Sequence, residues 1–171
     1  TIQARHMLNW DARIARFGDL IESKEVLNDV FVKPSSDRKE FLAGVVYEQT
    51  IEQWLSGQFT SLIDPDCMVQ ISSVKRTLAE WRIFMVNGKA AASSQYFRNG
   101  VVKPDRFVPR SVEVFAEWLN GIYEPHHYAY VVDICLTEDY EYKIVEYNCI
   151  NCSGLYDCDV NQLLRSILQL S

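Results

Sequence analysis

Asp133, Glu146 and Asn148 are the residues whose types and spacing suggest chemistry most directly. Asp133 interrupts an apolar run, where a carboxylate is costly unless a cation or a metal compensates its charge. Glu146 and Asn148 are two positions apart, so in an extended strand their side chains share one face. If the two segments pair, three oxygen ligands line one wall, and such ligands suit Mg²⁺. The alternative is a surface hairpin whose polar face is simply solvated.

The segments that carry these residues have the pattern of a β-hairpin. Residues 130–136 and 142–147 are rich in β-branched and aromatic side chains, and a short acidic turn separates them. The alternation along residues 130–136 places Asp133 on the face opposite Val132 and Ile134. We therefore expect the hairpin to hold the three candidate ligands.

Lys33 ends another apolar strand pattern, residues 29–34, which a proline stops. The loop that follows contains Ser35, Ser36 and Lys39. Backbone N–H groups, two hydroxyls and several cations in one short loop could surround a polyphosphate, although the spacing of a Walker loop is absent. The alternative is a strand-end lysine that extends its ammonium group into solvent.

Arg82 lies in a third strand pattern, residues 78–86, which has a clear two-residue period. Glu80 and Arg82 share the face opposite Trp81 and Ile83. A guanidinium group in a fixed position is well suited to contact a phosphate or an acyl-phosphate. The alternative is a same-strand ion pair between Glu80 and Arg82, worth less than about 1 kcal/mol if exposed.

These three patterns, in this order, resemble the motifs of the ATP-grasp family. Residues 30–36 (Val-Phe-Val-Lys-Pro-Ser-Ser) resemble its lysine strand and phosphate-covering loop. Residues 80–86 (Glu-Trp-Arg-Ile-Phe-Met-Val) resemble its Glu-x-Arg strand, and are especially similar to a clade of amidoligases known mostly from bacteria and their phages. Asp133, then Val-Glu-Tyr-Asn at 145–148 and the small-residue loop 152–154, resemble its closing hairpin. The resemblance runs from about Asp29 to the C-terminus.

The resemblance implies an α+β fold, in which an antiparallel sheet with packed helices binds nucleotide between two β-layers. It divides the chain into 1–28, an N-terminal helix or remnant of a preceding domain, and 29–171, an ATP-grasp-like domain. The spacing of apolar residues predicts a helix over residues 4–21. Family members normally carry an N-terminal domain before the lysine strand. We therefore expect a missing N-terminal domain or a homo-oligomer partner to complete the site.

The resemblance also implies roles for individual residues. Asp133, Glu146 and Asn148 would hold the magnesium ions that bridge the ATP phosphates. Lys33 would contact the α- and β-phosphates, and Arg82 the transferring phosphoryl group or acyl-phosphate, so these two are the expected catalytic residues. The remaining nucleotide-binding residues would be Ser35, Ser36 and Lys39 over the phosphates, Gln70, Ile71 and Ser72 near the adenine edge, and Glu80.

The implied activity is that of an ATP-dependent carboxylate–amine ligase that forms an amide or peptide bond through an acyl-phosphate. The carboxylate and amine substrates are not identifiable from the sequence. The alternative is a catalytically inactive ATP-grasp-like module that binds or interacts without ligating anything. The intact set of candidate metal ligands favours the ligase, and the short segment before Lys33 favours the module.

Composition limits the partners and the compartment. The formal net charge of −6 argues against a general nucleic-acid or anionic-membrane surface. No apolar run reaches the roughly 20 residues that span a bilayer, and no signal peptide is visible. The five cysteines, an odd number, favour reduced thiols in the cytoplasm, and the resemblance favours a bacterial or phage-infected cell.

Two further groups of residues leave alternatives open. Cys149, Cys152 and Cys158 have part of the spacing of a structural zinc site, which needs a fourth ligand; the alternative is small apolar packing residues. Residues 98–110 are expected to form a loop bounded by Gly100 and Pro104. Its cations form a solvated face unless one of three arginines, Arg98, Arg106 and Arg110, enters the site.

Overall fold

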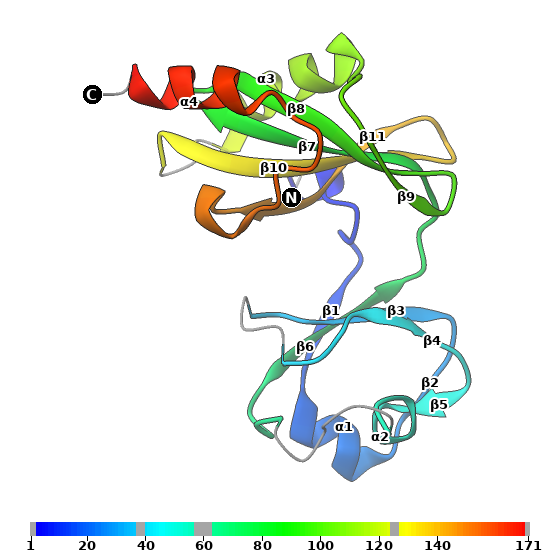
Figure 1. The fold of residues 1–171 in the computed structure, drawn as a ribbon. Coiled ribbons are helices and arrows are strands. Elements are labelled where there is room, and N and C mark those ends of the chain that lie inside the picture. The colour runs from blue at the N-terminus through cyan, green and yellow to red at the C-terminus, as the bar shows by residue number, and fades with distance from the viewer. Residues whose placement is uncertain (1–2, 37–39, 57–62, 124–126, 170–171) are drawn as a thin grey trace. The chain divides into compact units, whose positions relative to one another are not determined.

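The computed structural model describes residues 3–36, 40–56, 63–123 and 127–169. These residues form two compact units, whose elements Figure 1 labels. Unit 2 is the continuous segment Asn9–Lys75, whereas unit 1 consists of the residues up to Leu8 and those from Arg76 onward. The predicted division into 1–28 and 29–171 concerns the extent of the ATP-grasp-like region and stays a prediction.

Unit 1 is built on a five-stranded antiparallel sheet with the order β11-β10-β7-β8-β9. Its strands are β7 (Thr77–Val86), β8 (Lys89–Arg98), β9 (Val101–Asp105), β10 (Ala129–Thr137) and β11 (Tyr142–Asn148). Its helices are α3 (Arg110–Tyr123) and α4 (Val160–Leu168), with 3₁₀ turns at Gln3–His6 and Ile150–Cys152. The antiparallel α+β class is confirmed.

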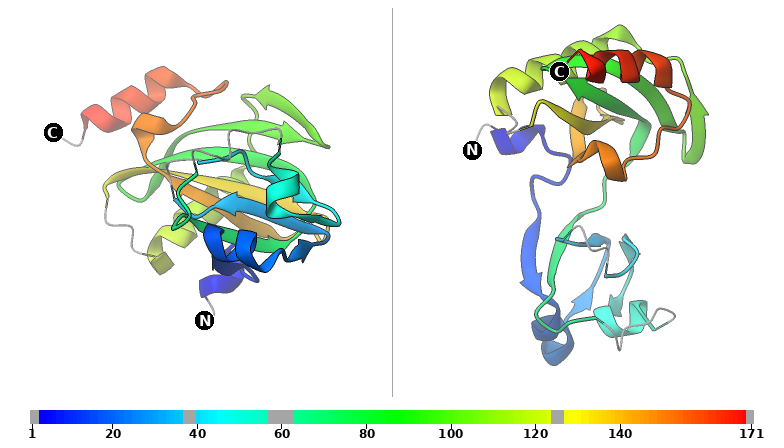
Figure 2. Two further views of the ribbon diagram at one scale, coloured as in Figure 1. Left: turned by 90° about the horizontal axis from the view of Figure 1, so that it is seen from below. Right: turned by 60° about the vertical axis from the view of Figure 1, so that its left-hand side comes forward.

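Side-chain alternation along β7 gives the sheet two apolar faces. Ile83 and Met85 belong to the core that α3 covers, whereas Phe84 and Val86 pack in a second core with Leu163 of α4. The two helices lie on opposite sides of the sheet (Figure 2). Because α4 covers only one end of its face, the rest of that face is left to the polar residues of the candidate site.

Unit 2 contains a four-stranded antiparallel sheet, β1-β6-β3-β4, and a two-stranded sheet, β2-β5. The strands are β1 (Arg13–Arg16), β2 (Val26–Leu27), β3 (Val30–Pro34), β4 (Gly44–Val46), β5 (Gln49–Thr50) and β6 (Met68–Ser73). Two short helices, α1 (Phe17–Ser23) and α2 (Ile51–Trp54), pack on one face of the larger sheet through Phe17, Leu20 and Ile51. Thr50 and Gln53 form a capping box that starts α2.

The helix predicted over residues 4–21 is wrong. A 3₁₀ turn, β1 and α1 replace it, and only Phe17 and Leu20 bury their side chains in the manner of a helix face. Ile14, which contributed to the apparent helical period, lies in β1 opposite Gln70 and is 55% exposed. Pairing with β6 outweighs the weak local preference of these residues for helix.

The loop predicted over residues 98–110 is also wrong in part, because residues Val101–Asp105 form β9. Asn99 and Gly100 both have positive φ and make a tight turn into this strand. Pro104 lacks an N–H group, and an edge strand tolerates that loss because one side of it has no neighbouring strand. None of the helices in the described ranges is long and apolar enough to cross a membrane.

Candidate functional site

Asp133, Glu146 and Asn148 lie on one face of the β10–β11 hairpin, as the pattern predicts. Asp133 pairs with Glu146 across the strands, and Val131 pairs with Asn148. The register shifts by one residue next to Asp133, which leaves Val145 as the additional residue of a β-bulge. Because of this bulge, Ile144 enters the apolar core under α3 while Glu146 faces the other side with Asp133.

A hydrogen bond joins two of these side chains directly. The Nδ2 group of Asn148 donates to Oε1 of Glu146 at 2.7 Å. No Lys or Arg among the described residues forms an ion pair with Glu146. The carboxylate of Glu146 and the amide oxygen of Asn148 are therefore hard oxygen donors that a magnesium ion could use.

Asp133 and Arg82 form a buried ion pair across β10 and β7. Nε and Nη2 of Arg82 donate to the two oxygens of Asp133 at 2.9 and 2.7 Å, and the two residues are 8% and 2% exposed. Burial raises the pKa of the Asp133 carboxyl, and the hydrogen bonds and charge of Arg82 oppose that rise. Hydrogen bonds to Asp133 in turn raise the pKa of Arg82.

The remaining contacts of Arg82 reach the loop after β11. Nη1 donates to the backbone oxygen of Gly154 at 3.2 Å. The guanidinium carbon lies 5.7 Å from the ring centroid of Tyr96 and 5.1 Å from that of Tyr156, and these two rings are stacked. All three nitrogens of the guanidinium group therefore donate to protein oxygens. Its predicted contact with a transferring phosphoryl group stays a prediction.

Glu80 does not pair with Arg82 in the described structure. Its carboxylate accepts hydrogen bonds from the hydroxyls of Thr77 and Tyr96, at 2.7 and 2.6 Å. Burial and the neighbouring carboxylates of Asp133 and Glu80 raise the pKa of Tyr96 far above its usual range, so its hydroxyl stays protonated and donates. The role of Glu80 in nucleotide binding stays a prediction.

In unit 2, Lys33 and Gln70 are cross-strand partners on one face of the four-stranded sheet. Phe31 and Ser72 pair next to them on the same face. The opposite face is buried and includes the side chain of Ile71, which is 4% exposed in the core. The side chain of Ile71 therefore cannot contact a ligand on the face of Lys33 and Gln70, and its place near the adenine edge stays a prediction.

The loop after Lys33 is only partly described. The backbone N–H of Ser35 donates to the carbonyl of Met68 at 2.8 Å, and the hydroxyl of Ser36 donates to Glu40 at 2.6 Å. The Ser35 N–H is therefore used within the fold and is not available for a phosphate. Lys39 lies outside the described residues.

The predicted site residues thus form two sets, one in each unit. The nucleotide set lies in unit 2 and comprises Lys33, Ser35, Ser36, Gln70, Ile71 and Ser72. The metal set lies in unit 1 and comprises Asp133, Glu146 and Asn148, together with Arg82 and Glu80. In the first set Lys33 and Gln70 pair across the strands while the side chain of Ile71 lies in the core, and in the second Asp133 pairs with both Glu146 and Arg82.

The sequence interpretation missed Tyr96, Tyr156 and the backbone oxygen of Gly154. The only signal near them in the sequence was the small-residue loop at 152–154, which was part of the resemblance to the closing hairpin. Tyr156 has φ of +49°, a conformation that is uncommon for residues with a side chain and that no sequence pattern indicated.

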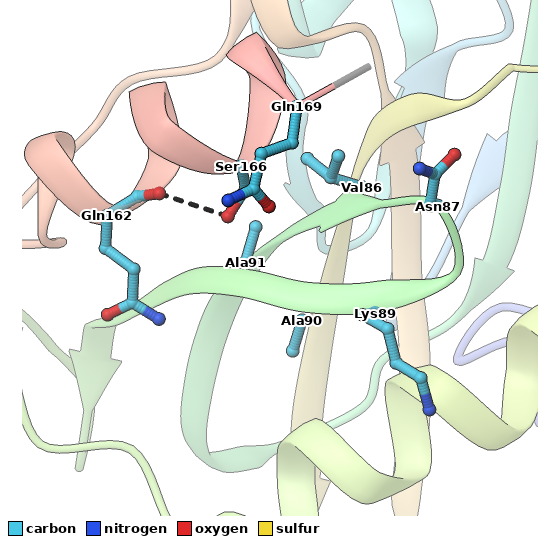
Figure 3. Close-up of a pocket in the computed structure, with 8 residues that line it drawn as sticks. All are labelled: Val86, Asn87, Lys89, Ala90, Ala91, Gln162, Ser166 and Gln169. Carbon is cyan, nitrogen blue, oxygen red and sulfur yellow. Dashed lines mark hydrogen bonds between the residues drawn. The ribbon is translucent and has the colours of Figure 1, made fainter.

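The cysteines and a cavity are the remaining candidate features. Among the residues that the structure describes, no three His, Cys, Asp or Glu side chains gather as metal ligands, and Cys158 is buried in the core under α4. A cavity of about 240 Å³ lies beside the β7–β8 turn and α4 (Figure 3). It is lined by Val86, Asn87, Lys89, Ala90, Ala91, Gln162, Ser166 and Gln169. None of the predicted site residues is among them.

Solved structures of ATP-grasp proteins share this fold. N5-carboxyaminoimidazole synthase from Aspergillus clavatus has a TM-score of 0.59 at 16% identity, over 99% of this chain and 50% of that chain. An ATP-grasp RimK domain protein from Sphaerobacter thermophilus has a TM-score of 0.58 at 15% identity, over 96% of this chain and 57% of that one. D-alanine–D-alanine ligase from Bacillus anthracis has a TM-score of 0.53 at 14% identity, over 94% and 59%.

The chain spans a little over half the length of the solved structures that it matches. No curated protein matches it. The sequence model of the ATP-grasp domain, R₂K clade family 2, matches residues 10–166, which is most of the chain. The protein therefore belongs to family 2 of the R₂K clade of ATP-grasp domains.

Proposed function

We propose that this protein binds Mg-ATP and acts as a carboxylate–amine ligase. The observation that carries the proposal is the set of oxygen donors on the β10–β11 hairpin. Glu146 and Asn148 stand next to Asp133 in the register, and no described cation neutralises Glu146. Family membership supports the choice of ATP as the ligand.

The residues present fit a magnesium ion. Glu146 and Asn148 would supply carboxylate and amide oxygens, and Asp133 would add a carboxylate whose orientation is fixed by Arg82. A bound magnesium ion would neutralise the charge of the nucleotide phosphates. Lys33, next to Gln70 on the open face of unit 2, would add a cation for those phosphates.

The reaction that we propose has two steps. A substrate carboxylate oxygen attacks the γ-phosphorus of ATP, the bond to the bridging oxygen of ADP breaks, and an acyl-phosphate and ADP result. An amine then attacks the acyl carbon, phosphate leaves with the bonding electrons, and loss of a proton from nitrogen gives the amide. Such phosphoryl transfer needs positioning and charge stabilisation and no protein nucleophile.

Relatives with the same fold guide the choice of substrates. One solved relative is an ATP-grasp ligase, PsnB, in complex with a precursor peptide, and another is a D-alanine–D-alanine ligase in complex with ATP. We therefore propose a carboxylate and an amine as the substrates here, with peptides and amino acids to be tried first.

The test is calorimetric titration with a non-hydrolysable ATP analogue, with and without Mg²⁺. We expect saturable binding that requires Mg²⁺ and that Glu146→Gln abolishes, because the variant loses a charged oxygen ligand. Glu138→Gln is the matched control, since Glu138 is exposed on the turn of the same hairpin. Circular dichroism verifies that each variant is folded.

Three outcomes would contradict the proposal in whole or in part. Absence of binding by a folded chain would remove the nucleotide from the assignment. Binding that is unchanged in Glu146→Gln would show that the hairpin does not hold the metal. Mg-dependent binding without turnover of any carboxylate and amine would favour the inactive binding module instead.

A further inference from the structure

We propose that Arg82 is a positioning residue that ties the loop Ser153–Cys158 to the carboxylate of Asp133. This inference rests on the proposed function only where it concerns the metal. In the structure the guanidinium group contacts the hairpin on one side and the loop on the other. One side chain therefore fixes both the candidate metal ligand and the loop.

The hydrogen bonds of Arg82 have a geometry that other side chains could not reproduce. Nε and Nη2 meet both oxygens of Asp133, which fixes the plane of the carboxylate as well as its position. Nη1 reaches the oxygen of Gly154 from the same rigid fork. A lysine has a single ammonium group on a flexible stem, so it could not hold these three acceptors at once.

The aromatic contacts add to this fixation. Tyr156 comes from the loop and Tyr96 from β8, with ring centroids 5.1 Å apart and planes within 14° of each other. The guanidinium carbon of Arg82 lies within 6 Å of both centroids, the range in which cation–π attraction is significant. Tyr96 is itself held through its hydroxyl by Glu80.

The loop needs such contacts, because its backbone is strained. Tyr156 has φ of +49°, a conformation that costs a non-glycine residue free energy and persists only where surrounding contacts enforce it. Two further hydrogen bonds hold the next residue: the backbone N–H of Asp157 donates to the hydroxyl of Ser94, and Nε of Arg106 donates to the carbonyl of Asp157, both at 3.2 Å. Ser94 is fully buried, so it marks the second anchor of the loop.

Two possible roles of Arg82 predict opposite changes in the affinity for Mg²⁺. If Arg82 acted only through its charge, its removal would raise the affinity for Mg²⁺, since a cation near the ligands would be lost. If Arg82 positions Asp133, its removal lowers the affinity, because the carboxylate loses its fixed orientation. We expect a loss of about 10–100-fold, as is typical when the partner that orients a metal ligand is removed.

The experiment compares Arg82→Met and Arg82→Lys with the wild type. The first measurement is amide hydrogen exchange of residues 153–158 without any metal or nucleotide. The second is the affinity for Mg²⁺, taken from the Mg²⁺ dependence of ATP-analogue binding. Arg110→Met is the matched control, because Arg110 is exposed and pairs with Glu113 of α3, which packs on the other face of the sheet.

We expect both Arg82 variants to exchange faster than the wild type in residues 153–158, with unchanged exchange in α3, and to bind Mg²⁺ more weakly. Arg110→Met should change neither quantity. Wild-type exchange of the loop in either variant would overturn the inference, and Arg82→Lys decides the question if Arg82→Met does not fold. If the wild type binds no Mg-ATP, the proposed function fails, while the exchange experiment still decides whether Arg82 holds the loop.

Discussion

At the scale of single residues, the sequence predicted the face on which Asp133 lies but not the residue that pairs with it. The two-residue period correctly placed Asp133, Glu146 and Asn148 on one face. It could not show that Arg82 bonds Asp133, because the register between β7 and β10 is set by the whole sheet. Directly opposite residues have Cβ atoms about 4.5–5.5 Å apart, closer than same-strand neighbours two positions apart, so the cross-strand partner replaces Glu80.

The burial of this pair predicts a large cost when one member is removed. Asp133→Asn keeps the size of the side chain but leaves the charge of Arg82 buried without a counter-ion. We expect a loss of about 3–5 kcal/mol in the free energy of unfolding, measured by urea denaturation. Asp139→Asn, on the exposed turn of the same hairpin, should cost almost nothing.

The double variant Asp133→Leu with Arg82→Met tests whether the lost ion pair or the unpaired buried charge causes the destabilisation. Replacing both charges by apolar side chains removes the uncompensated charge, so the double variant should be more stable than Asp133→Asn alone. A double variant that is less stable than the single one would show that the ion pair itself stabilises the fold.

At the scale of elements, two Asn-Gly turns organise the sheet of unit 1. Asn87-Gly88 joins β7 to β8 and Asn99-Gly100 joins β8 to β9, and all four residues have positive φ. Such turns match the twist of antiparallel strands. An Asn-Gly pair between two strand patterns is itself a hairpin signal, whereas Pro104 concealed the strand that follows the second turn. The bulge at Val145 could not be predicted either, since one additional residue leaves no mark in an apolar pattern.

Gly88 and Gly100 share the turn type but differ in their surroundings, so alanine variants at the two positions can be compared directly. A Cβ atom on Gly88 would lie 2.6 Å from Nδ2 of Asn120, whose Oδ1 accepts a hydrogen bond from Tyr130. A Cβ atom on Gly100 would meet nothing within 4 Å. Gly100→Ala should therefore cost only the backbone strain, about 1 kcal/mol.

Gly88→Ala should lower the free energy of unfolding by about a further 1–3 kcal/mol, because the new methyl group displaces the side chain of Asn120, which a hydrogen bond holds in place. Thermal and urea unfolding of the two variants measure the difference. Equal destabilisation of Gly88→Ala and Gly100→Ala would mean that Asn120 moves away without cost.

At the scale of the whole molecule, the chain enters unit 2 at Asn9 and leaves it at Lys75. A hydrogen-bonded cluster joins these two ends. Oδ2 of Asp11 accepts from the backbone N–H and the hydroxyl of Ser73, at 3.2 and 2.6 Å, and Lys75 forms an ion pair with the other oxygen. No local pattern indicated this contact, because its members lie far apart in the sequence.

The cluster predicts how the stability of unit 2 depends on pH. Partial burial raises the pKa of Asp11, but hydrogen bonds from Lys75 and Ser73 outweigh it and lower the pKa from the usual 3.8 to about 2. The cluster therefore stabilises the folded state fully above about pH 4, and this contribution is lost as the pH falls toward 2.

Asp11→Asn tests this dependence. The variant should be less stable than the wild type at pH 5, and the difference should shrink as the pH approaches 2; urea unfolding followed by amide exchange in β6 measures it. Asp29→Asn, an exposed carboxylate in the same unit, is the control and should follow the wild-type pH profile. A difference that stays constant from pH 5 to 2 would contradict the assignment.

The same connectivity has a consequence for the order in which the protein is made. Unit 2 is one continuous segment, so all of it has been synthesised once Lys75 leaves the ribosome. The residues before it belong to unit 1, where the backbone N–H of Leu8 donates to the carbonyl of Ile144 at 2.7 Å. The residues up to Leu8 therefore complete their contacts in unit 1 only after Ile144 has been synthesised, while unit 2, which follows them, can fold during translation.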